Sequence, residues 1–328
     1  METTVKTKME GLKFGEIQIH NHVAVIPIIG NCDIGPVYLT MKEAMESHFL
    51  TVAEVTEGGA VPELKVINQA DMPVLLIDGE EISGAKQNRV LNTTILLKEK
   101  SETVIPVSCT EHGRWSYSSA HFEESGYIMS AKLRSVKNAS VHENLKSERS
   151  YRSDQGAVWD EIAIQAHANF VSTPTGAMRD VLEAKQEDMD AFLEHFPIVA
   201  DQNGLLFMVN GEVVGLDMVS REPAFRILYP KLIRSYVMDA LTEKPVKGKE
   251  PSQEKADTFL KKIPGCIENP FDSVGYGKDY RYEGKKIVGS ALVHENIVIH
   301  MAFFQITGTE KIGRMSSVSQ RRANRTNQ

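Results

Sequence analysis

The side chains best suited to chemistry lie in one segment, Asp78 to Thr94, between the apolar stretches Val74 to Ile77 and Ile95 to Leu97. The segment contains carboxylates, an ammonium group, a guanidinium group and several side-chain amides. Burying such groups without partners costs roughly 2 to 7 kcal/mol each, so they must bond to one another, to the backbone or to a ligand. The pattern predicts the floor of a polar site, but it does not name a reaction.

The acidic residues at the start of this segment suggest acid–base chemistry. On an extended chain Asp78 and Glu80 lie on one side, about 6.6 to 7 Å apart, and Glu81 points to the other side. Inverting glycoside hydrolases hold two carboxyl groups about 6.5 to 9.5 Å apart around a water molecule. The spacing therefore fits hydrolysis at an anomeric carbon, although Asp78-Gly79 is also a typical turn sequence.

The middle of the segment suggests ligand binding. Gly84-Ala85 lets a backbone approach a ligand closely. The next four residues supply donors suited to phosphate, carboxylate or ribose oxygens; they are Lys86, Gln87, Asn88 and Arg89. If a strand begins at Lys86, alternation places Lys86, Asn88, Asn92 and Thr94 on one face. This polar stripe is either a binding surface or an internal polar network.

A second polar cluster follows the predicted strand Val104 to Val107. Cys109 can be a nucleophile activated by His112, or Cys109, His112 and His121 can hold a metal ion. Both patterns are incomplete, because Cys-x-x-His lacks a full tetrahedral ligand set. Arg114 beside Trp115 is the better binding signal, since it offers a charged fork and an aromatic surface.

Two further features lie near the end of the chain. The segment from Gly275 to Arg281 resembles a glycine-bearing anion loop, but it lacks the Walker spacing and also fits a tight turn. In the last predicted hairpin, counting from the turn places His300 opposite Ala291. We expect His300 to be a packed strand residue.

The spacing of apolar residues changes along the chain, from a strand pattern to a helix pattern, and so predicts which elements position these residues. Up to about Tyr127 the pattern predicts strands, with one helix from Met41 to Ser47 capped by Thr40 and Glu43. The predicted strands are 23–29, 51–55, 64–67, 74–77, 91–97 and 104–107. A helix is then predicted from Ser153 towards Phe170, and a second one starts at Thr173-Pro174 and reaches Phe196.

The last third of the chain alternates between strand and helix patterns. Strands at 205–209 and 213–218 form a predicted hairpin across Asn210-Gly211, and strands at 286–293 and 297–304 form another across Glu295-Asn296. Helices are predicted at 223–241, where Pro230 must start or kink a helix, and at 253–262. The fold class is therefore α+β, with a β-rich N-terminal lobe (1–129), a central helical segment (130–200), a mixed α/β lobe (201–308) and a basic disordered tail (309–328).

Composition limits the class of protein. The chain has 328 residues, of which 41% are hydrophobic and 25% charged, as in ordinary globular proteins. Its apolar stretches are too short to span a membrane, and its three cysteines are widely separated, so we expect a cytoplasmic protein. A net charge of −7 makes nucleic acid an unexpected partner. The basic tail is either solvated or a contact for an anion or partner.

Five motifs together resemble a family named for its association with ADP-ribosylglycohydrolases and rhodanese/phosphatase-superfamily proteins. They begin at Gly58, Leu75, Gly84, Leu91 and Ile105, the last reading Ile-Pro-Val-Ser-Cys-Thr-Glu-His-Gly-Arg-Trp-Ser. The resemblance implies a place in NAD or ADP-ribose metabolism by association, without a known reaction. It directs attention to ten residues, namely Glu80, Glu81, Lys86, Gln87, Asn88, Arg89, Asn92, Glu111, Arg114 and Trp115.

We therefore expect a protein that binds a phosphorylated ribose compound related to ADP-ribose or NAD, with hydrolysis or transfer as a further step. Glu80, Glu81 and Glu111 are the candidate catalytic residues, and Glu80 or Glu81 is the expected general base. The candidate substrate-binding residues are Lys86, Gln87, Asn88, Arg89, Asn92, Arg114 and Trp115. The cofactor is unknown and a homo-oligomer is compatible with the sequence. The alternatives are a noncatalytic interaction protein with an internal polar network, and a metalloenzyme using Cys109 and His112.

Overall fold

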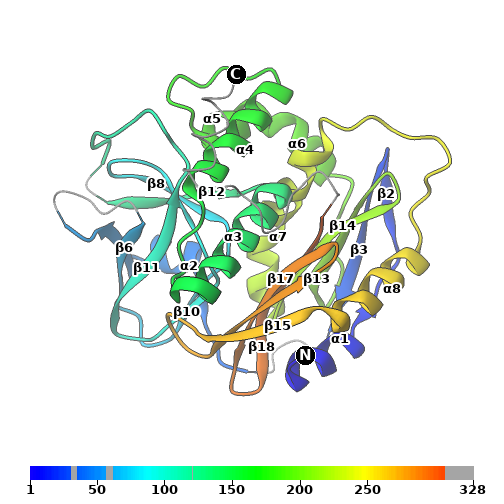
Figure 1. The fold of residues 1–328 in the computed structure, drawn as a ribbon, viewed down its shortest axis with the longest axis horizontal. Coiled ribbons are helices and arrows are strands. Elements are labelled where there is room, and N and C mark those ends of the chain that lie inside the picture. Colours follow the sequence, from blue (N-terminus) through cyan, green and yellow to red (C-terminus); the bar gives the residue numbers. More distant parts are fainter. Residues whose placement is uncertain (31–34, 57–61, 120, 307–328) are drawn as a thin grey trace.

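The computed structural model describes residues 1–30, 35–56, 62–119 and 121–306, and it confirms the α+β class. The Gly58-Gly59 motif and the predicted basic tail lie outside the described residues. The predicted division of the chain into four segments, at residues 129, 200 and 308, is not tested by the structure and remains a prediction. In the order of the chain, strands dominate the first part, helices follow, and strands and helices mix at the end (Figure 1).

A nine-stranded antiparallel sheet forms one side of the molecule (Figure 1). Its order is β1-β3-β13-β14-β18-β17-β16-β15, and β2 also pairs with β3. Because β3 pairs with β13, strands from the two ends of the chain share this sheet. The strands are β1 Lys13–Phe14, β2 Gln18–His20, β3 Val23–Ile29, β13 Gln202–Val209, β14 Glu212–Val219, β15 Ile267–Asp272, β16 Lys278–Gly284, β17 Ile287–His294 and β18 Ile297–Gln305.

A six-stranded sheet lies on the opposite side, in the order β12-β8-β9-β11-β6-β5. Its two outer strands, β12 and β5, contact each other, so we call it the curled sheet. Its apolar inner side chains form a separate core with a small three-stranded sheet, β10-β7-β4. The strands are β4 Leu39–Thr40, β5 Leu50–Glu54, β6 Glu63–Asn68, β7 Val74–Leu76, β8 Glu80–Gly84, β9 Arg89–Leu91, β10 Ile95–Leu97, β11 Ser101–Cys109 and β12 Phe122–Ile128.

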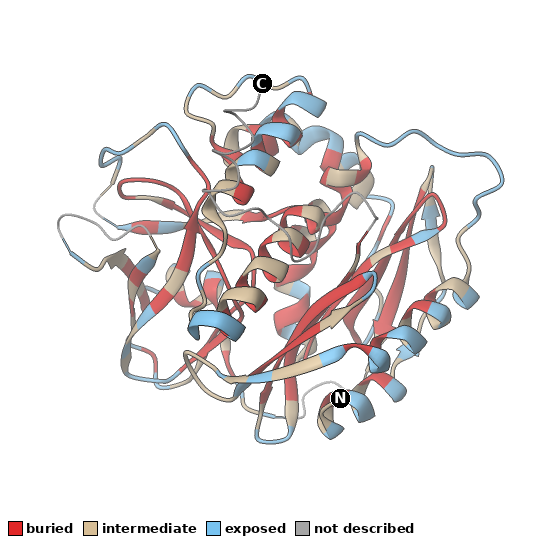
Figure 2. Ribbon diagram, viewed as in Figure 1, coloured by how far each residue is buried: buried red, intermediate tan, exposed pale blue. Residues whose placement is uncertain are grey.

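Helices lie between the two large sheets and outside the nine-stranded one (Figure 1). Helices α3 and α7 pack on the inner face of the nine-stranded sheet, while α1 and α8 cover its outer face. Both faces of this sheet are therefore buried, and its central strands are buried along nearly their whole length (Figure 2). The helices are α1 Thr3–Glu10, α2 Met41–Glu46, α3 Ala131–Glu148, α4 Gln155–Ala168, α5 Met178–Ala184, α6 Gln186–Leu193, α7 Glu222–Ala240 and α8 Gln253–Lys262, followed by a 3₁₀ turn at Ile263–Gly265.

Several sequence predictions are confirmed. Helix α2 starts with the predicted capping box of Thr40 and Glu43. Both predicted hairpins form, β13–β14 around Asn210-Gly211 and β17–β18 around Glu295-Asn296. These elements combine a local apolar pattern with a local start or turn signal, so neighbouring residues are enough to specify them.

Other predictions are wrong. The helix expected from Thr173 to Phe196 begins only at Met178 and is divided into α5 and α6 at Lys185. Asp154, not Ser153, caps α4 by accepting from the amide of Ala157. The helix predicted at 223–241 is confirmed as α7, and Pro230 lies inside it, so of the two predicted roles of Pro230 the start of a helix is excluded. The long helix α3 lies within the predicted helical segment 130–200, but no separate helix was predicted at its residues.

Two strand predictions also fail. The strand expected from Leu91 to Leu97 is two short strands, β9 and β10, in different sheets. His300 pairs with Leu292 instead of Ala291, because a register shift between Leu292 and Val293 moves the pairing by one residue.

Candidate functional site

The polar segment enters the curled sheet instead of forming one loop. Residues 80–84 form β8 and residues 89–91 form β9, and these two strands pair through Glu81 with Val90 and Ile82 with Arg89. Paired residues share one face, and Ile82 belongs to the inner core of the curled sheet. Arg89 therefore points into the curled sheet near its end.

Arg89 has no exposed surface, although it is a guanidinium. Its Nη1 donates to the Gln87 carbonyl and side-chain oxygens at 3.1 and 3.2 Å. The Cys109 thiol donates to the same side-chain oxygen of Gln87 at 3.2 Å. Burial lowers the pKa of Arg89 and raises that of Cys109 to about 11. Cys109 is therefore a neutral thiol at pH 7, which argues against the thiolate nucleophile considered from the sequence.

An aromatic surface, with the buried Lys86 ammonium packed against it, lies next to Arg89. The Lys86 ammonium lies 5.4 Å from the ring centre of Trp115 and 5.1 Å from that of Tyr117. The Arg89 guanidinium lies 5.8 Å from the Trp115 ring. Both rings remain about half exposed, at 48% and 54%. We call Lys86, Trp115 and Tyr117 the aromatic surface. Trp115 contacts both the buried Arg89 and the solvent.

Arg114 holds the loop that carries these rings. It bonds to the Glu111 carboxylate at 2.7 and 2.9 Å, to the Asn88 side-chain oxygen at 3.1 Å and to the Ala85 carbonyl at 2.9 Å. Burial by itself raises the pKa of Glu111, but hydrogen bonds from Arg114 and Thr175 outweigh it, so the pKa is lowered. Glu111 is therefore ionised. The Arg114 and Glu111 side chains hydrogen-bond to each other and to neighbouring residues of the protein, instead of pointing towards a ligand.

Glu81 is the carboxyl group with the strongest chemical signal. It is fully buried, and its Oε1 accepts a 2.9 Å hydrogen bond from the Thr110 hydroxyl. Within the described residues its Oε2 has no partner. Burial raises its pKa to about 7. A group that titrates near neutral pH can accept and donate a proton, as a general acid or base requires.

Asp78 and Glu80 do not form the pair predicted on an extended chain. A turn at Asp78-Gly79 brings the Glu80 amide to 3.2 Å from the Ile77 carbonyl, and Gly79 has φ +84°. The Glu80 carboxylate accepts from Lys231 of α7 at 2.6 Å, whereas Asp78 binds Lys137 of α3. The turn directs each carboxylate to a different helix, so this alternation prediction is wrong.

Asn92 and Thr94 are in the loop between β9 and β10, and they face different partners. Asn92 donates to the Tyr151 carbonyl at 3.0 Å and accepts from Ser108 at 2.6 Å. Thr94 bonds to His300 Nδ1 at 2.7 Å. The single polar face predicted for Lys86, Asn88, Asn92 and Thr94 is therefore wrong, because the strand stops at residue 91.

Thr94 belongs to a buried network that joins both sheets through α3. His300 Nε2 lies 3.2 Å from Asp217, which also accepts from Tyr236 at 2.6 Å and from Arg134 at 2.7 and 2.9 Å. Burial would raise the pKa of Asp217, but the Arg134 charge outweighs it and lowers the pKa to about 2. A Thr–His–Asp arrangement resembles a hydrolase triad, but here the Asp217 charge is already neutralised by Arg134.

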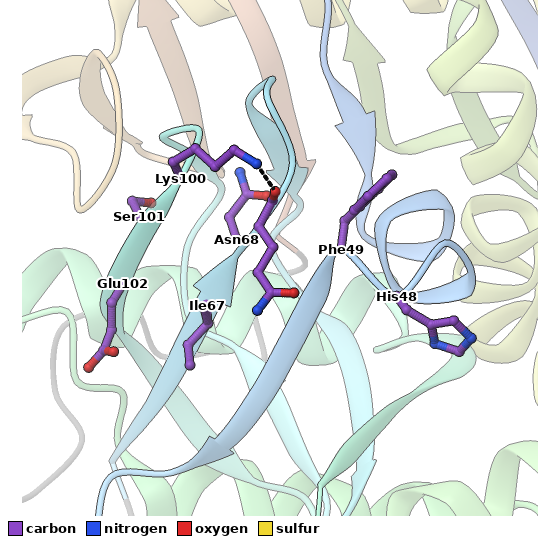
Figure 3. Close-up of a pocket in the computed structure, with 8 residues that line it drawn as sticks. His48, Phe49, Ile67, Asn68, Lys100, Ser101 and Glu102 are labelled. Carbon is purple, nitrogen blue, oxygen red and sulfur yellow. Dashed lines mark hydrogen bonds between the residues drawn. The ribbon is translucent and has the colours of Figure 1, made fainter.

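A surface hollow of about 650 Å³ lies at the other end of the curled sheet. Figure 3 shows its lining around the start of β5, the end of β6 and the start of β11, with the Lys100 ammonium donating to the Gln69 carbonyl. The aromatic surface lies beyond the opposite ends of β5 and β11, so none of the predicted site residues lines this hollow. Its lining residues are His48, Phe49, Ile67, Asn68, Gln69, Lys100, Ser101 and Glu102.

Two residues next to the candidate site were given no role in the sequence analysis. Tyr117 completes the aromatic surface, and Glu54 lies with its carboxylate 4.0 Å from Arg89. Glu54 could have been found from alternation, because Leu50 and Val52 of the same strand point into the core. A charged residue at the next inward position indicates a buried polar group.

The described residues contain no group of three His, Cys, Asp or Glu side chains arranged to hold a metal ion. The Gly275 loop packs against β10 of the three-stranded sheet, where the Tyr276 backbone amide donates to the Leu96 carbonyl at 2.8 Å. A Cβ at Gly275 would lie 2.1 Å from that carbonyl oxygen. Close backbone contact therefore accounts for this glycine.

The fold and site define an α+β protein whose curled sheet has a polar end covered by an aromatic surface. A family model matches residues 11–304, and the chain belongs to the family described as ARG and Rhodanese-Phosphatase-superfamily-associated Protein. Comparison with curated proteins and with solved structures found no match. Among the described helices, none is long and apolar enough to cross a membrane.

Proposed function

We propose that the protein binds a phosphorylated ribose compound related to ADP-ribose or NAD at the aromatic surface. The observation that carries this proposal is the position of the Lys86 ammonium over two half-exposed rings, Trp115 and Tyr117. Aromatic rings stack on nucleotide bases, each contact contributing about 1 to 3 kcal/mol. A lysine ammonium binds phosphate as a point charge.

The family description supports this choice of ligand by association. It links the family to ARG, which we interpret as ADP-ribosylglycohydrolase. Substrate binding is assigned to Lys86 and Trp115 directly. Arg114 and Asn88 act by holding the loop, because they bond to each other at 3.1 Å.

The proposed chemical step is hydrolysis or transfer at the ribose, with proton transfer assigned to Glu81. Its pKa of about 7 allows a large fraction of both protonation states near neutral pH. Glu80 is a weaker choice for this role because Lys231 already neutralises it at 2.6 Å. A Glu81→Gln variant should therefore lose turnover of ADP-ribose while it still binds the ligand.

Ligand binding can be tested by thermal unfolding with ADP-ribose, NAD and ribose 5-phosphate. A ligand present at 100 times its Kd stabilises the folded protein by about 2.7 kcal/mol, which gives a measurable rise in Tm. Trp115→Ala should weaken binding about tenfold or more, since it removes one stacking ring. The matched control is Phe170→Ala, which removes a ring that is 95% exposed on another loop. If none of the three compounds raises the Tm, this function is rejected.

The second candidate is a noncatalytic interaction protein whose polar segment is structural. The observation that favours it is the pairing of Asp78 and Glu80 with lysines of α3 and α7. These bonds connect the curled sheet to the central helices instead of facing a ligand. Under this alternative, no nucleotide changes the Tm, and the Glu81→Gln variant differs from the natural protein in stability but not in any ligand-dependent property.

A further inference from the structure

Glu54 and Arg89 form a buried pair whose hydrogen bonds are incomplete. The Arg89 Nη2 lies 4.0 Å from Glu54 Oε1, which is beyond hydrogen-bond distance. The side chains are 0% and 5% exposed. Within the described part of the chain, both Glu54 oxygens and the Arg89 Nε and Nη2 atoms have no hydrogen-bond partner. Buried polar atoms are rarely left in this condition, so a further hydrogen-bonding group, outside the described residues, is expected there.

The location of the pair connects it to the aromatic surface. Arg89 lies 5.8 Å from the ring centre of Trp115, and that ring is also 5.4 Å from the Lys86 ammonium. A nucleotide that stacks on Trp115 therefore binds a ring that also contacts Arg89, and Glu54 is the charged neighbour of that arginine. One end of such a ligand would lie near Lys86 and the other near the buried pair.

The charges of the pair restrict what can bind. A carboxylate would be attracted by Arg89 but repelled by Glu54, and an ammonium would meet the opposite conflict. A neutral group with one acceptor and one donor side by side satisfies both residues. A carboxamide has this arrangement, as does the lactam edge of a nucleobase.

We propose that Glu54 and Arg89 recognise the carboxamide of a bound nicotinamide nucleotide, the member of the proposed ligand class that carries such an edge. The ligand N–H donates to the Glu54 carboxylate, and the ligand carbonyl accepts from the Arg89 guanidinium. This assignment rests on the proposed function, because it requires the rest of the nucleotide to lie on the aromatic surface. It makes the pair a specificity determinant for the base, separate from the Lys86 contact to phosphate.

Two nucleotides that differ only at this edge provide the test. Nicotinamide mononucleotide carries a carboxamide, and nicotinic acid mononucleotide carries a carboxylate on the same phosphorylated ribose. We expect isothermal titration calorimetry to give a Kd about tenfold or more lower for the carboxamide, since one buried hydrogen bond to a charged group is lost and a repulsion appears with the acid.

The Glu54→Gln variant tests the role of Glu54 itself. A glutamine amide can donate to a carboxylate, so the preference for the carboxamide should fall to about threefold or less. Glu102→Gln is the matched control, because the Glu102 side chain is 59% exposed on β11 and forms a surface ion pair with Lys65. The control should keep the full preference. If Glu54→Gln does not fold, the comparison of the two nucleotides on the natural chain still decides.

The outcomes separate this inference from the proposed function. Equal affinity for the two mononucleotides overturns the inference and indicates that a buried water bonds to the pair, while the proposed function stands. Binding of ADP-ribose without binding of either mononucleotide also overturns it. If ADP-ribose, NAD and both mononucleotides all fail to bind, the proposed function fails as well.

Discussion

Asp217 binds the guanidinium of Arg134 through both of its carboxylate oxygens, at 2.7 and 2.9 Å, and neither side chain has exposed surface. Asp217 is on β14 of the nine-stranded sheet and Arg134 is on α3, so the pair attaches the central helix to the sheet. The same carboxylate meets His300 at 3.2 Å, and His300 bonds to Thr94 in the β9–β10 loop. The hydrogen bonds from Arg134 through Asp217 and His300 to Thr94 therefore connect the nine-stranded sheet to the loop that leaves the curled sheet.

Removing Arg134 should therefore destabilise the whole molecule. An Arg134→Met variant leaves the Asp217 carboxylate buried without its main counter-charge, and such losses cost about 3 to 5 kcal/mol. Urea unfolding followed by circular dichroism measures the change. The matched control is Arg226→Met, which removes an exposed ion pair with Glu222 and should cost at most about 1 kcal/mol. Similar losses in the two variants would show that the buried pair has no special role.

The raised pKa of Glu81 predicts a pH dependence of stability. The group has a pKa of about 7 in the folded protein and an ordinary value of 4.5 when unfolded. Between these values the folded state keeps a proton that the unfolded state releases, so stability falls as pH rises from about 4.5 to 7. The loss levels off above pH 7 and amounts to about 3 kcal/mol.

Glu81→Gln removes this titration while keeping the shape of the side chain. The variant should be more stable than the natural protein at pH 8, with a smaller difference at pH 5, as measured by urea midpoints at both values. Asp239 also has a raised pKa, of about 6, and its contribution is common to both proteins. Parallel pH profiles for the two proteins would mean that Glu81 is already ionised at pH 5.

Lys231 should be needed to keep Glu80 in the interior. Burial would lower the lysine pKa, but Glu80 and Glu124 outweigh this and raise it, so the ammonium stays charged. Among the described residues, Lys231→Met leaves the Glu80 carboxylate with the Ile77 amide as its remaining partner, at 2.8 Å, and the change should cost about 3 kcal/mol or more.

A double-mutant cycle checks this pairing. Adding Glu80→Gln to Lys231→Met removes the unpaired charge, so the double variant should be more stable than the sum of the single changes predicts, by about 1 to 3 kcal/mol. Additive effects on the free energy of unfolding would show that the two groups do not interact. The Lys231 result also bears on Glu80 as a general base, since its carboxylate already accepts a hydrogen bond from the Lys231 ammonium at 2.6 Å.

The sequence allowed the hairpins to be predicted better than the strands of the candidate site. Residues 205–209 and 213–218 are two largely apolar runs joined by Asn210-Gly211, so neighbouring residues specify both strands and turn. Strand β8 was not recognised because Glu80 and Glu81 look like loop residues. The Glu80 partner, Lys231, is 151 residues away, and no local pattern contains that information.

The candidate site was also predicted only in part, because contacts between residues that are distant in the sequence leave no local pattern. Lys86, Arg89 and Trp115 were identified from residue type, and the structure places them together. Arg114 was expected to bind an anion, but its acceptors are supplied by Glu111, Asn88 and the loop backbone. Whether a cation faces a ligand or the protein depends on the final packing of its loop, which residue types do not specify.

Gly79 should tolerate no side chain because of its contact with Arg134. Its φ is +84°, and an added Cβ would lie 2.9 Å from Arg134 Cγ. Gly248 has nearly the same backbone conformation, φ +79°, with nothing within 4 Å of the added Cβ. Gly79→Ala should cost more than Gly248→Ala, because both pay the backbone strain of about 1 to 3 kcal/mol but only Gly79→Ala displaces the arginine. Chemical unfolding of the two variants measures the difference, and equal losses would mean that Arg134 moves aside without weakening its bonds to Asp217.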